Sequence, residues 1–325
     1  MNVLVTGASG FLGRYVLASL CRHAIGFVAA GRRRPEHVAD DAFISADLLS
    51  LSSKDCRELI AASGATHLLH QAWTTEHGQY WRSPANLRWV EATVRLVEEF
   101  CEAGGQQVVV AGTCAEYEWC EPICDEFRTP LVPATLYGAA KDATRRLVEA
   151  ICRERRVPCA WGRVFLPFGA GESSLRLVPS LIDALRGTRA PFSIDAAARR
   201  DFLHAGDVAE AFVTLLKSGA SGPFNISSGE TVAIDALLRE LAAQLQADPA
   251  PILALARSRE GEPAVLTGDN SRLRALGFTP CHTLRSGLAL TLADRRHGID
   301  AHPSDAHTSD CHPSAIHRGA ATNEA

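Results

Sequence analysis

The sequence contains no apolar run of about 18 residues, the length that a membrane-spanning helix requires. Its first apolar segment, residues 3–5, begins almost at Met1, so we expect no secretory signal peptide there. The formal net charge is −4, and there is no basic excess that would indicate binding to nucleic acid. These absences predict a cytoplasmic protein with neither a membrane nor a nucleic acid as its partner.

None of the ten cysteines forms a C-x-x-C pair with another. In a chain of this length without a secretory signal, scattered cysteines are typical of reduced thiols. Cys114, Cys120 and Cys124 lie close together in the sequence, but no histidines stand at a matching spacing. We therefore predict no metal site.

Two short motifs carry most of the chemical information. Gly7, Gly10 and Gly13 follow a short apolar strand and precede a helix, which is the pattern of a loop that binds a dinucleotide pyrophosphate. About 130 residues later, Tyr137 and Lys141 stand four residues apart, so a helix would place them on one face. A nearby ammonium favours the phenolate form, and we expect Tyr137 to exchange a proton closer to neutral pH than a free phenol does. Together the motifs indicate redox chemistry.

The order of apolar segments predicts an α/β fold of the Rossmann type, a doubly wound parallel sheet with a smaller C-terminal substrate-binding lobe. Strands are expected at 2–6, 26–30, 42–45, 67–70, 107–111 and 158–163, and helices near 11–23, 55–63, 84–104 and 136–155. We assign residues 1–165, together with 205–229, to a nucleotide-binding domain. Residues 166–204 and 230–296 are assigned to the lobe.

The last segment, 297–325, differs from the rest in composition. Its histidines recur every five residues, at His297, His302, His307, His312 and His317. Five is the period of neither a helix nor a strand, and the segment has too few apolar residues for a core, so we predict a disordered His-rich tail.

The ordered motifs resemble those of the extended short-chain dehydrogenase/reductase family, in the NAD(P)-dependent epimerase/dehydratase branch that modifies nucleotide sugars. The resemblance covers about residues 1–295, and its markers are the glycine motif, Ala46-Asp47-Leu48, His70-Gln71-Ala72, Asn86 with Thr93, Tyr137-x-x-x-Lys141, Arg200-Asp201-Phe202 and Asp207-Val208-Ala209.

The resemblance implies a role for each matching residue. Tyr137 would exchange the proton at the substrate oxygen, Lys141 would lower the pKa of Tyr137 and hold the nicotinamide ribose, and Thr113 would hydrogen-bond the reacting oxygen. The implied cofactor contacts are Gly7, Ser9, Gly10, Phe11, Leu12, Gly13, Asp47, Leu48, Gln71, Ala72 and Lys141. The implied substrate contacts are Trp73, Thr113, Arg176, Arg200 and Arg259.

The end of the second strand bears on the choice of cofactor. Family members that prefer NAD place an acid there, whereas this chain has Arg32 and Arg33. Guanidinium groups suit a ribose 2′-phosphate, so NADP(H) is favoured over NAD(H), with a solvated basic turn as the alternative.

Arg200 and Arg259 resemble two arginines that grip the nucleotide diphosphate in relatives. The chain departs from the family pattern at Glu262, where many relatives have Asp, and at Leu166, where many have Asn. The second change removes an amide that often contacts the diphosphate, which leaves the nucleotide open.

Three functions remain open at this point. Dehydratases of the family have Asp-Glu directly after the Thr, but here Cys114 and Ala115 follow Thr113, which disfavours dehydration. We expect an NADP(H)-dependent reductase of a nucleotide-linked 4-keto (deoxy)sugar, with Tyr137 as proton donor. The alternatives are a nucleotide-sugar C4-epimerase with tightly bound NAD(P) and, third, an NADP(H) sensor without activity. The apolar faces of the helices near 84–104 and 136–155 predict either intramolecular core or a homodimer seam.

Overall fold

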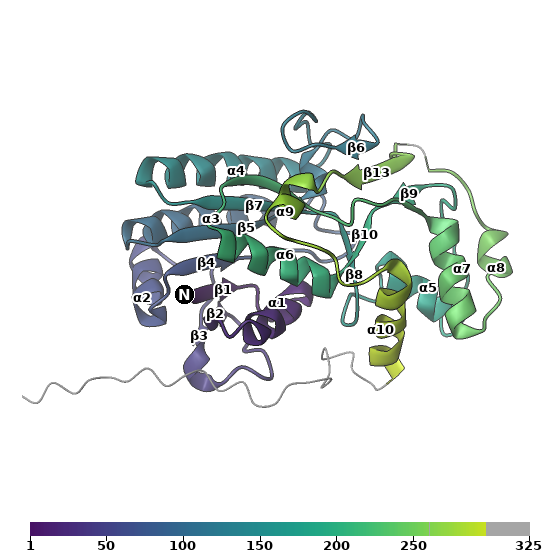
Figure 1. Cartoon of the computed structure of the whole chain (residues 1–325), viewed down its shortest axis with the longest axis horizontal. Helices are drawn as coiled ribbons and strands as arrows, with labels where there is room; N and C mark the ends of the chain where they lie inside the picture. The colour runs from purple at the N-terminus through teal and green to yellow at the C-terminus, as the bar shows by residue number, and fades with distance from the viewer. Residues whose placement is uncertain (260, 297–325) are drawn as a thin grey trace, which may run out of the picture.

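The computed structural model describes residues 1–259 and 261–296. Seven parallel strands form the central sheet, in the order β11-β7-β5-β4-β1-β2-β3 (Figure 1). Their bounds are β1 Asn2–Thr6, β2 Gly26–Gly31, β3 Phe43–Ser45, β4 His67–His70, β5 Gln107–Thr113, β7 Cys159–Val164 and β11 Gly222–Ile226. The chain winds outward from β1 through β2 to β3, then returns to β4 beside β1 and winds outward in the opposite direction. The predicted doubly wound sheet is confirmed. The predicted tail lies outside the described residues.

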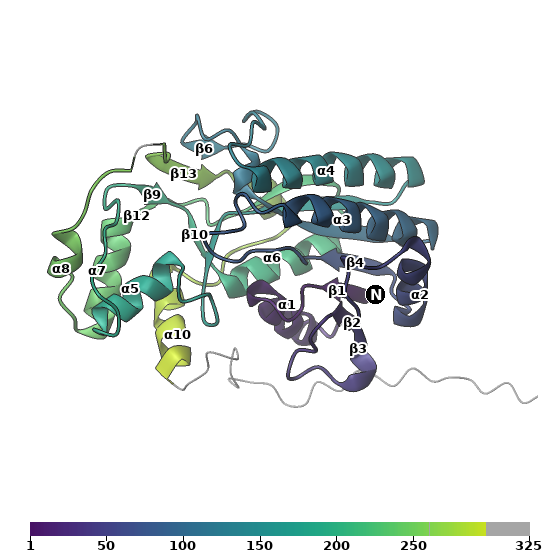
Figure 2. The ribbon, with the colours of Figure 1, turned by 180° about the vertical axis from the view of Figure 1, so that it is seen from behind.

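Helices cover both faces of this sheet. α1 (Phe11–Arg22) and α6 (Ala205–Ser218) pack on one face. α2 (Ser53–Ser63), α3 (Ala85–Glu102) and α4 (Leu136–Arg155) cover the other face. Because both faces are covered, a central strand such as β5 is buried at all seven of its residues. The view from behind shows α3 and α4 lying side by side on the outside of the molecule (Figure 2).

A smaller lobe lies beyond the carboxyl ends of the parallel strands (Figure 1). Its helices are α5 (Leu177–Leu185), α7 (Ile234–Leu245), α8 (Ala250–Leu253) and α10 (Leu284–Arg296). Two small sheets join it to the larger part: β8 (Leu166–Phe168) with β10 (Phe202–His204), and the four-stranded order β12-β9-β13-β6. The lobe has a separate apolar core, which includes Leu181, Leu237 and Leu288.

The four-stranded sheet connects segments that are far apart in the sequence. Its strands are β12 (Val232–Ala233), β9 (Arg199–Arg200), β13 (Val265–Gly268) and β6 (Ile123–Cys124). The short helix α9 (Ser271–Ala275) contacts β11 of the large sheet. Segments from within 1–165 and from 265–275 therefore cross between the two parts. The sequence-based division does not include these crossings. Among the described helices, none is both long and apolar enough to cross a membrane.

Candidate active site

The glycine loop lies where the winding direction of the sheet reverses, between β1 and β4. Gly7 has φ +77°, a conformation that favours glycine, and a Cβ on it would stand 2.8 Å from the backbone N of Ala72. A Cβ on Gly13 would stand 2.2 Å from the carbonyl oxygen of Gly7, so only glycine allows α1 to approach the loop this closely. Gly10 caps α1 without a side-chain hydrogen bond, which leaves first-turn N–H groups to bind an anion.

The segment that follows β4, beside the glycine loop, supplies a second indication of a ligand. The side-chain amide of Gln71 follows β4, and among the described residues neither its Nε2 nor its Oε1 has a hydrogen-bond partner, although both atoms are buried. Buried polar groups are normally satisfied, so a pair of orphaned atoms beside the glycine loop fits a polar ligand. The glycine loop and the Gln71 amide therefore fit the dinucleotide expected from the sequence.

The remaining cofactor-binding candidates lie around the same end of the sheet. Ser9, Phe11 and Leu12 belong to the glycine loop and the start of α1. Leu48 is buried, whereas Asp47 is exposed and accepts a hydrogen bond from the backbone N of Leu49. Arg32 and Arg33 are exposed directly after β2, and no acidic residue ends that strand.

Tyr137 lies in the first turn of α4, where it faces Thr113 at the end of β5. The hydroxyl of Thr135 accepts a hydrogen bond from the backbone N of Gly138, which fixes the start of the helix. The Tyr137 backbone N donates to the carbonyl of Trp81, and the Thr113 side chain lies close enough to the Tyr137 phenol to act on its pKa. Two residues that the sequence predicted to act together are thus brought together.

Lys141 lies one turn further along α4 and is buried. Its Nζ donates to the carbonyl oxygen of Ala111 at 2.9 Å and stands 3.9 Å from the centre of the Trp73 ring. The Trp73 indole in turn donates to the Oδ1 of Asn86, which is buried. Lys141 and Trp73 therefore share one wall of the site.

The electrostatic expectation for Tyr137 needs correction. Burial raises the pKa of the Tyr137 phenol above its ordinary value, and the hydrogen bond from Thr113 opposes this shift only in part. Burial also lowers the pKa of Lys141 to about 7, while the nearby Glu116 carboxylate acts in the opposite direction. The spacing of the two residues was read correctly, but desolvation, and not the ammonium of Lys141, is the largest cause acting on the Tyr137 pKa.

An aromatic cluster surrounds the Tyr137 ring. The edges of Tyr80 and Trp81 contact it, with ring centroids at 4.9 and 5.7 Å. Arg176, the residue before α5, donates to the Tyr80 hydroxyl at 3.2 Å and packs over the Tyr80 ring. The predicted substrate residue Arg176 thus stands one side chain away from Tyr137.

Arg200 and Arg259 are brought together through a single carboxylate. Arg200 is buried and donates to Glu262 and to the carbonyls of Arg199 and Pro263. Arg259 is exposed and pairs with the other oxygen of Glu262 at 3.2 Å. The two arginines predicted to bind one diphosphate therefore do converge.

Comparison with known proteins agrees with this geometry. The family model described as "NAD dependent epimerase/dehydratase family" matches residues 3–227. The chain belongs to this family.

Individual relatives resemble this family member over most of its length. The UDP-glucose 4-epimerase of Corynebacterium glutamicum is 26% identical over 91% of this chain and 98% of its own. The dTDP-6-deoxy-L-talose 4-dehydrogenase (NAD(+)) of Aggregatibacter actinomycetemcomitans is 24% identical over 75% of this chain and 90% of its own. Among solved structures, MoeE5 in complex with UDP-glucuronic acid and NAD is 29% identical, with a TM-score of 0.79 over 92% of this chain and 100% of MoeE5. MoeE5 has also been solved with UDP-glucose and NAD.

Sequence reasoning missed one charged residue of this epimerase/dehydratase-family site. Glu116 stands one residue beyond the dehydratase positions and is not among the predicted site residues, yet its carboxylate is buried and accepts a hydrogen bond from the backbone N of Thr113 at 2.8 Å. The Thr113 hydroxyl accepts in return from the backbone N of Ala115. Thr-x-x-Glu is the pattern of a capping box, and this signal in the sequence could have identified the pair.

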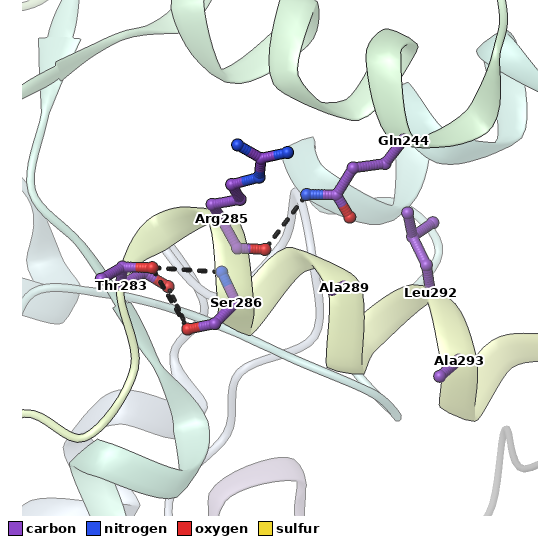
Figure 3. A pocket seen from close by; sticks show the side chains of 7 residues that line it. All are labelled: Gln244, Thr283, Arg285, Ser286, Ala289, Leu292 and Ala293. Carbon is purple, nitrogen blue, oxygen red and sulfur yellow. Dashed lines mark hydrogen bonds between the residues drawn. The ribbon is translucent and has the colours of Figure 1, made fainter.

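Two other features lie apart from the site. A cavity of about 540 Å³ between α7 and α10 contains none of the predicted site residues (Figure 3); it is lined by Gln244, Thr283, Arg285, Ser286, Ala289, Leu292 and Ala293. His204, Asp207 and His282 form the one cluster of possible metal ligands among the described residues. Its atoms already connect the start of α6 with the segment before α10, because Asp207 accepts from the backbone N of Cys281 and of His282, and Nδ1 of His204 accepts from the backbone N of Gly206.

Proposed function

We propose that the chain interconverts nucleotide sugars that differ in configuration at C4, the reaction that the sequence left as the alternative to 4-keto reduction. The observation that carries this proposal is the convergence of Tyr137, Thr113 and Lys141, with Cys114 and Ala115 where a dehydratase would have carboxylates. Such a site has one group for proton exchange at the sugar oxygen and lacks the acid and base for eliminating water. The near full-length similarity to a UDP-glucose 4-epimerase supports the same reaction.

Tyr137, Thr113 and Lys141 each have a separate role in this reaction. As the phenolate, Tyr137 takes the proton of the C4 hydroxyl, and Thr113 hydrogen-bonds the same oxygen. The glycine loop, Gln71 and Lys141 would hold an oxidised nicotinamide dinucleotide, which would supply reversible hydride acceptance from C4 and a positive charge that favours the Tyr137 phenolate. The resulting 4-keto sugar would then present its other face at C4, and Tyr137 would return the proton to the sugar oxygen. Lys141 orients the ribose beside the reacting carbon.

For the cofactor we retain NADP(H) over NAD(H). Arg32 and Arg33 are exposed after β2, in the place where an acid would accept hydrogen bonds from the ribose 2′-OH. Relatives such as MoeE5 bind NAD, so the decisive measurement is the affinity of the purified protein for NADP⁺ and for NAD⁺. Tighter binding of NADP⁺ is expected, and tighter binding of NAD⁺ would overturn this choice.

For the substrate we propose a nucleoside diphosphate sugar, with Arg200 and Arg259 at the diphosphate. Arg176 contacts Tyr80, whose ring packs against the Tyr137 ring, and we propose that this guanidinium lies near the C6 substituent of a bound hexose. A guanidinium suits a carboxylate at C6, and MoeE5 binds UDP-glucuronic acid. We therefore expect a nucleotide-linked hexuronate to be a better substrate than the hexose.

A second candidate, the NADPH-dependent reductase of a nucleotide-linked 4-keto sugar, is favoured by Arg32 and Arg33, since reductive pathways draw on NADPH. One experiment separates the two. The protein is incubated with UDP-glucose, UDP-glucuronic acid and a nucleotide 4-ketosugar, with each cofactor, and the sugar products are followed by NMR. Formation of the C4 epimer without net cofactor consumption supports the epimerase. Stoichiometric loss of NADPH with the ketosugar supports the reductase, and no reaction with any sugar contradicts both.

We also propose that the chain forms a homodimer through α3 and α4. These helices present Leu87 and Leu147 to solvent, 54% and 47% exposed. Apolar side chains at these positions suit a four-helix contact between two copies of the chain.

A further inference from the structure

Glu116 is the acidic residue closest in the chain to Thr113, and its side chain is fully buried. Its Oε1 accepts from the backbone N of Thr113 at 2.8 Å and from the Trp161 indole at 2.9 Å, and its Oε2 accepts from the Nε of Arg163 at 2.8 Å. A carboxylate held in three directions and without solvent contact requires an explanation beyond the short turn that it caps.

We propose that Glu116 is a positioning residue for Tyr137 and Lys141: it fixes the end of β5, where Thr113 lies beside Tyr137 and where the Ala111 carbonyl accepts from Lys141, and it places a carboxylate at that end. This inference rests on the proposed function, because it assigns a role in the same proton-exchange site.

The first part of the argument is geometric. The Thr113 hydroxyl can meet Tyr137 only if the backbone at the end of β5 is held in place, and Glu116 binds that backbone directly. Gly112 allows the approach, since a Cβ there would stand 2.7 Å from the Glu116 Oε1 and 2.1 Å from the Trp161 indole nitrogen. Glu116, Trp161 and the glycine form one tightly packed unit below the reacting hydroxyl.

The second part concerns charge around Lys141. From β4, His70 faces it; burial lowers the pKa of this histidine to about 3, so it is neutral. From the segment after β4 comes the Trp73 ring, and from α4 comes Tyr137, a neutral phenol. From the turn after β5 comes Glu116, the one acidic group found to raise the pKa of Lys141. Without this charge, burial would lower the pKa of Lys141 further, because the opposing effect of Glu116 would be lost.

The third part concerns what surrounds Glu116. β7 contributes Arg163, whose side chain is fully buried, and which also donates to the Tyr117 hydroxyl and the Glu126 carbonyl. From α4, Glu149 and Lys141 face it, and its own turn contributes Cys114. Arg163 is thus the cation that directly pairs with Glu116, and of these two groups Glu116 is the one found to act on the pKa of Lys141.

The chain offers an unusually direct measurement, because it has only three lysines: Lys54, Lys141 and Lys217. The titration of each ε-carbon can be followed by NMR in the full-length protein labelled with 13C-lysine. In Glu116→Gln, which keeps an oxygen to accept from Thr113, we expect the Lys141 midpoint to fall by about one pH unit. The exposed Lys54 and Lys217 serve as internal references and should not move.

Kinetics supply a second readout. If the protein turns over a nucleotide sugar, Glu116→Gln should lower kcat by about 10- to 100-fold and change KM little, and the alkaline fall in kcat should begin at lower pH. Glu116→Asp retains the charge and should restore the Lys141 midpoint in part; it replaces the Gln variant if the latter does not fold.

Glu126→Gln is the matched control. Glu126 is also buried and belongs to the same network, because its carboxylate accepts from the backbone N of Asn225, but it contacts neither Thr113 nor Lys141. Its replacement should leave the Lys141 midpoint unchanged. An unchanged midpoint in Glu116→Gln, or an equal shift in Glu126→Gln, would overturn the proposal. Absence of turnover with every sugar, combined with the expected titration, would contradict the proposed function and not the role of Glu116 in holding the lysine proton.

Discussion

For Tyr137 and Lys141, the sequence predicts the relative position of the two side chains but not their pKa values. Their spacing on α4 follows from the helical repeat, which is a local property. Their protonation depends on how deeply both are buried, and burial is produced by β4, β5 and the aromatic cluster around Tyr80. The pKa of Lys141, about 7, is therefore a consequence of the fold.

Tyr137→Phe should lower turnover by about 10²- to 10⁴-fold, because it removes the group that exchanges the proton and keeps the ring. The measurement is kcat with the nucleotide sugar that the product analysis identifies. Tyr15→Phe is a suitable comparison, since Tyr15 is equally buried and loses one hydrogen bond to the Ala170 carbonyl. Equal losses in the two variants would mean that Tyr137 acts through packing alone.

The glycine loop, its strand and its helix form an element whose geometry follows closely from local sequence. β1 and α4 have the predicted bounds, and the other predicted strands differ by at most two residues at an end. The later segments were harder to read, because the two-residue strands β6, β9 and β12 have no periodicity of their own. They exist only because partners from distant parts of the chain lie beside them.

Gly13→Ala tests the close approach of α1 to β1. The new Cβ would stand 2.2 Å from the Gly7 carbonyl oxygen, and the neighbouring atoms are backbone, which cannot move aside. We expect a loss of about 1–3 kcal/mol in the free energy of unfolding, with weaker dinucleotide binding. Denaturant unfolding and cofactor titration measure the two effects.

Gly26→Ala provides the control for that variant. Its Cβ would meet the Asn2 Oδ1 at 3.5 Å, an ordinary contact, so the change in stability should stay below about 0.5 kcal/mol. If Gly13→Ala were as stable as Gly26→Ala and bound the dinucleotide equally well, the tight loop would not be required.

In the molecule as a whole, the stability of the folded state depends on pH through a buried carboxyl group, that of Glu172. Glu172 follows β8, and its Oε2 is buried without a hydrogen-bond partner among the described residues. Burial raises the pKa of this carboxyl to about 8, although Arg176 and Arg295 oppose the shift. In the unfolded chain the group loses its proton near pH 4.5. The folded state thus binds more protons between these values, and its stability must fall as pH rises through that interval.

Glu172→Gln should remove this contribution. The melting temperature of the variant, relative to that of the unaltered protein, should increase from about pH 5 to about pH 8 and then level off. Thermal unfolding at a series of pH values measures this difference in melting temperature. Glu230→Gln, at an exposed residue, is the comparison, and its melting temperature should differ from that of the unaltered protein by the same amount at every pH. A flat difference for Glu172→Gln would show that the carboxyl ionises normally.

Leu147→Asp tests the proposed dimer. A charge on the outer face of α4 should convert a dimer to a monomer in sedimentation experiments, because an unpaired carboxylate would be buried at the seam. Leu255→Asp, at a residue 46% exposed in the smaller lobe, should leave the mass unchanged. A monomer in the unaltered protein would contradict the seam outright.

Patterns among residues that are close in the sequence determined the fold class of this protein and the elements of the larger part. The glycine spacing, the Tyr–Lys repeat and the alternation of strands and helices are local patterns, and they were sufficient for the fold class and for placing Tyr137 and Lys141 one turn apart on a helix. Contacts across long separations were decided by the tertiary structure alone: Glu116 with Arg163, Arg176 with Tyr80, and Arg200 with Glu262. The physical reason is that burial and charge at a site depend on which distant segments pack around it, and no local pattern encodes that packing.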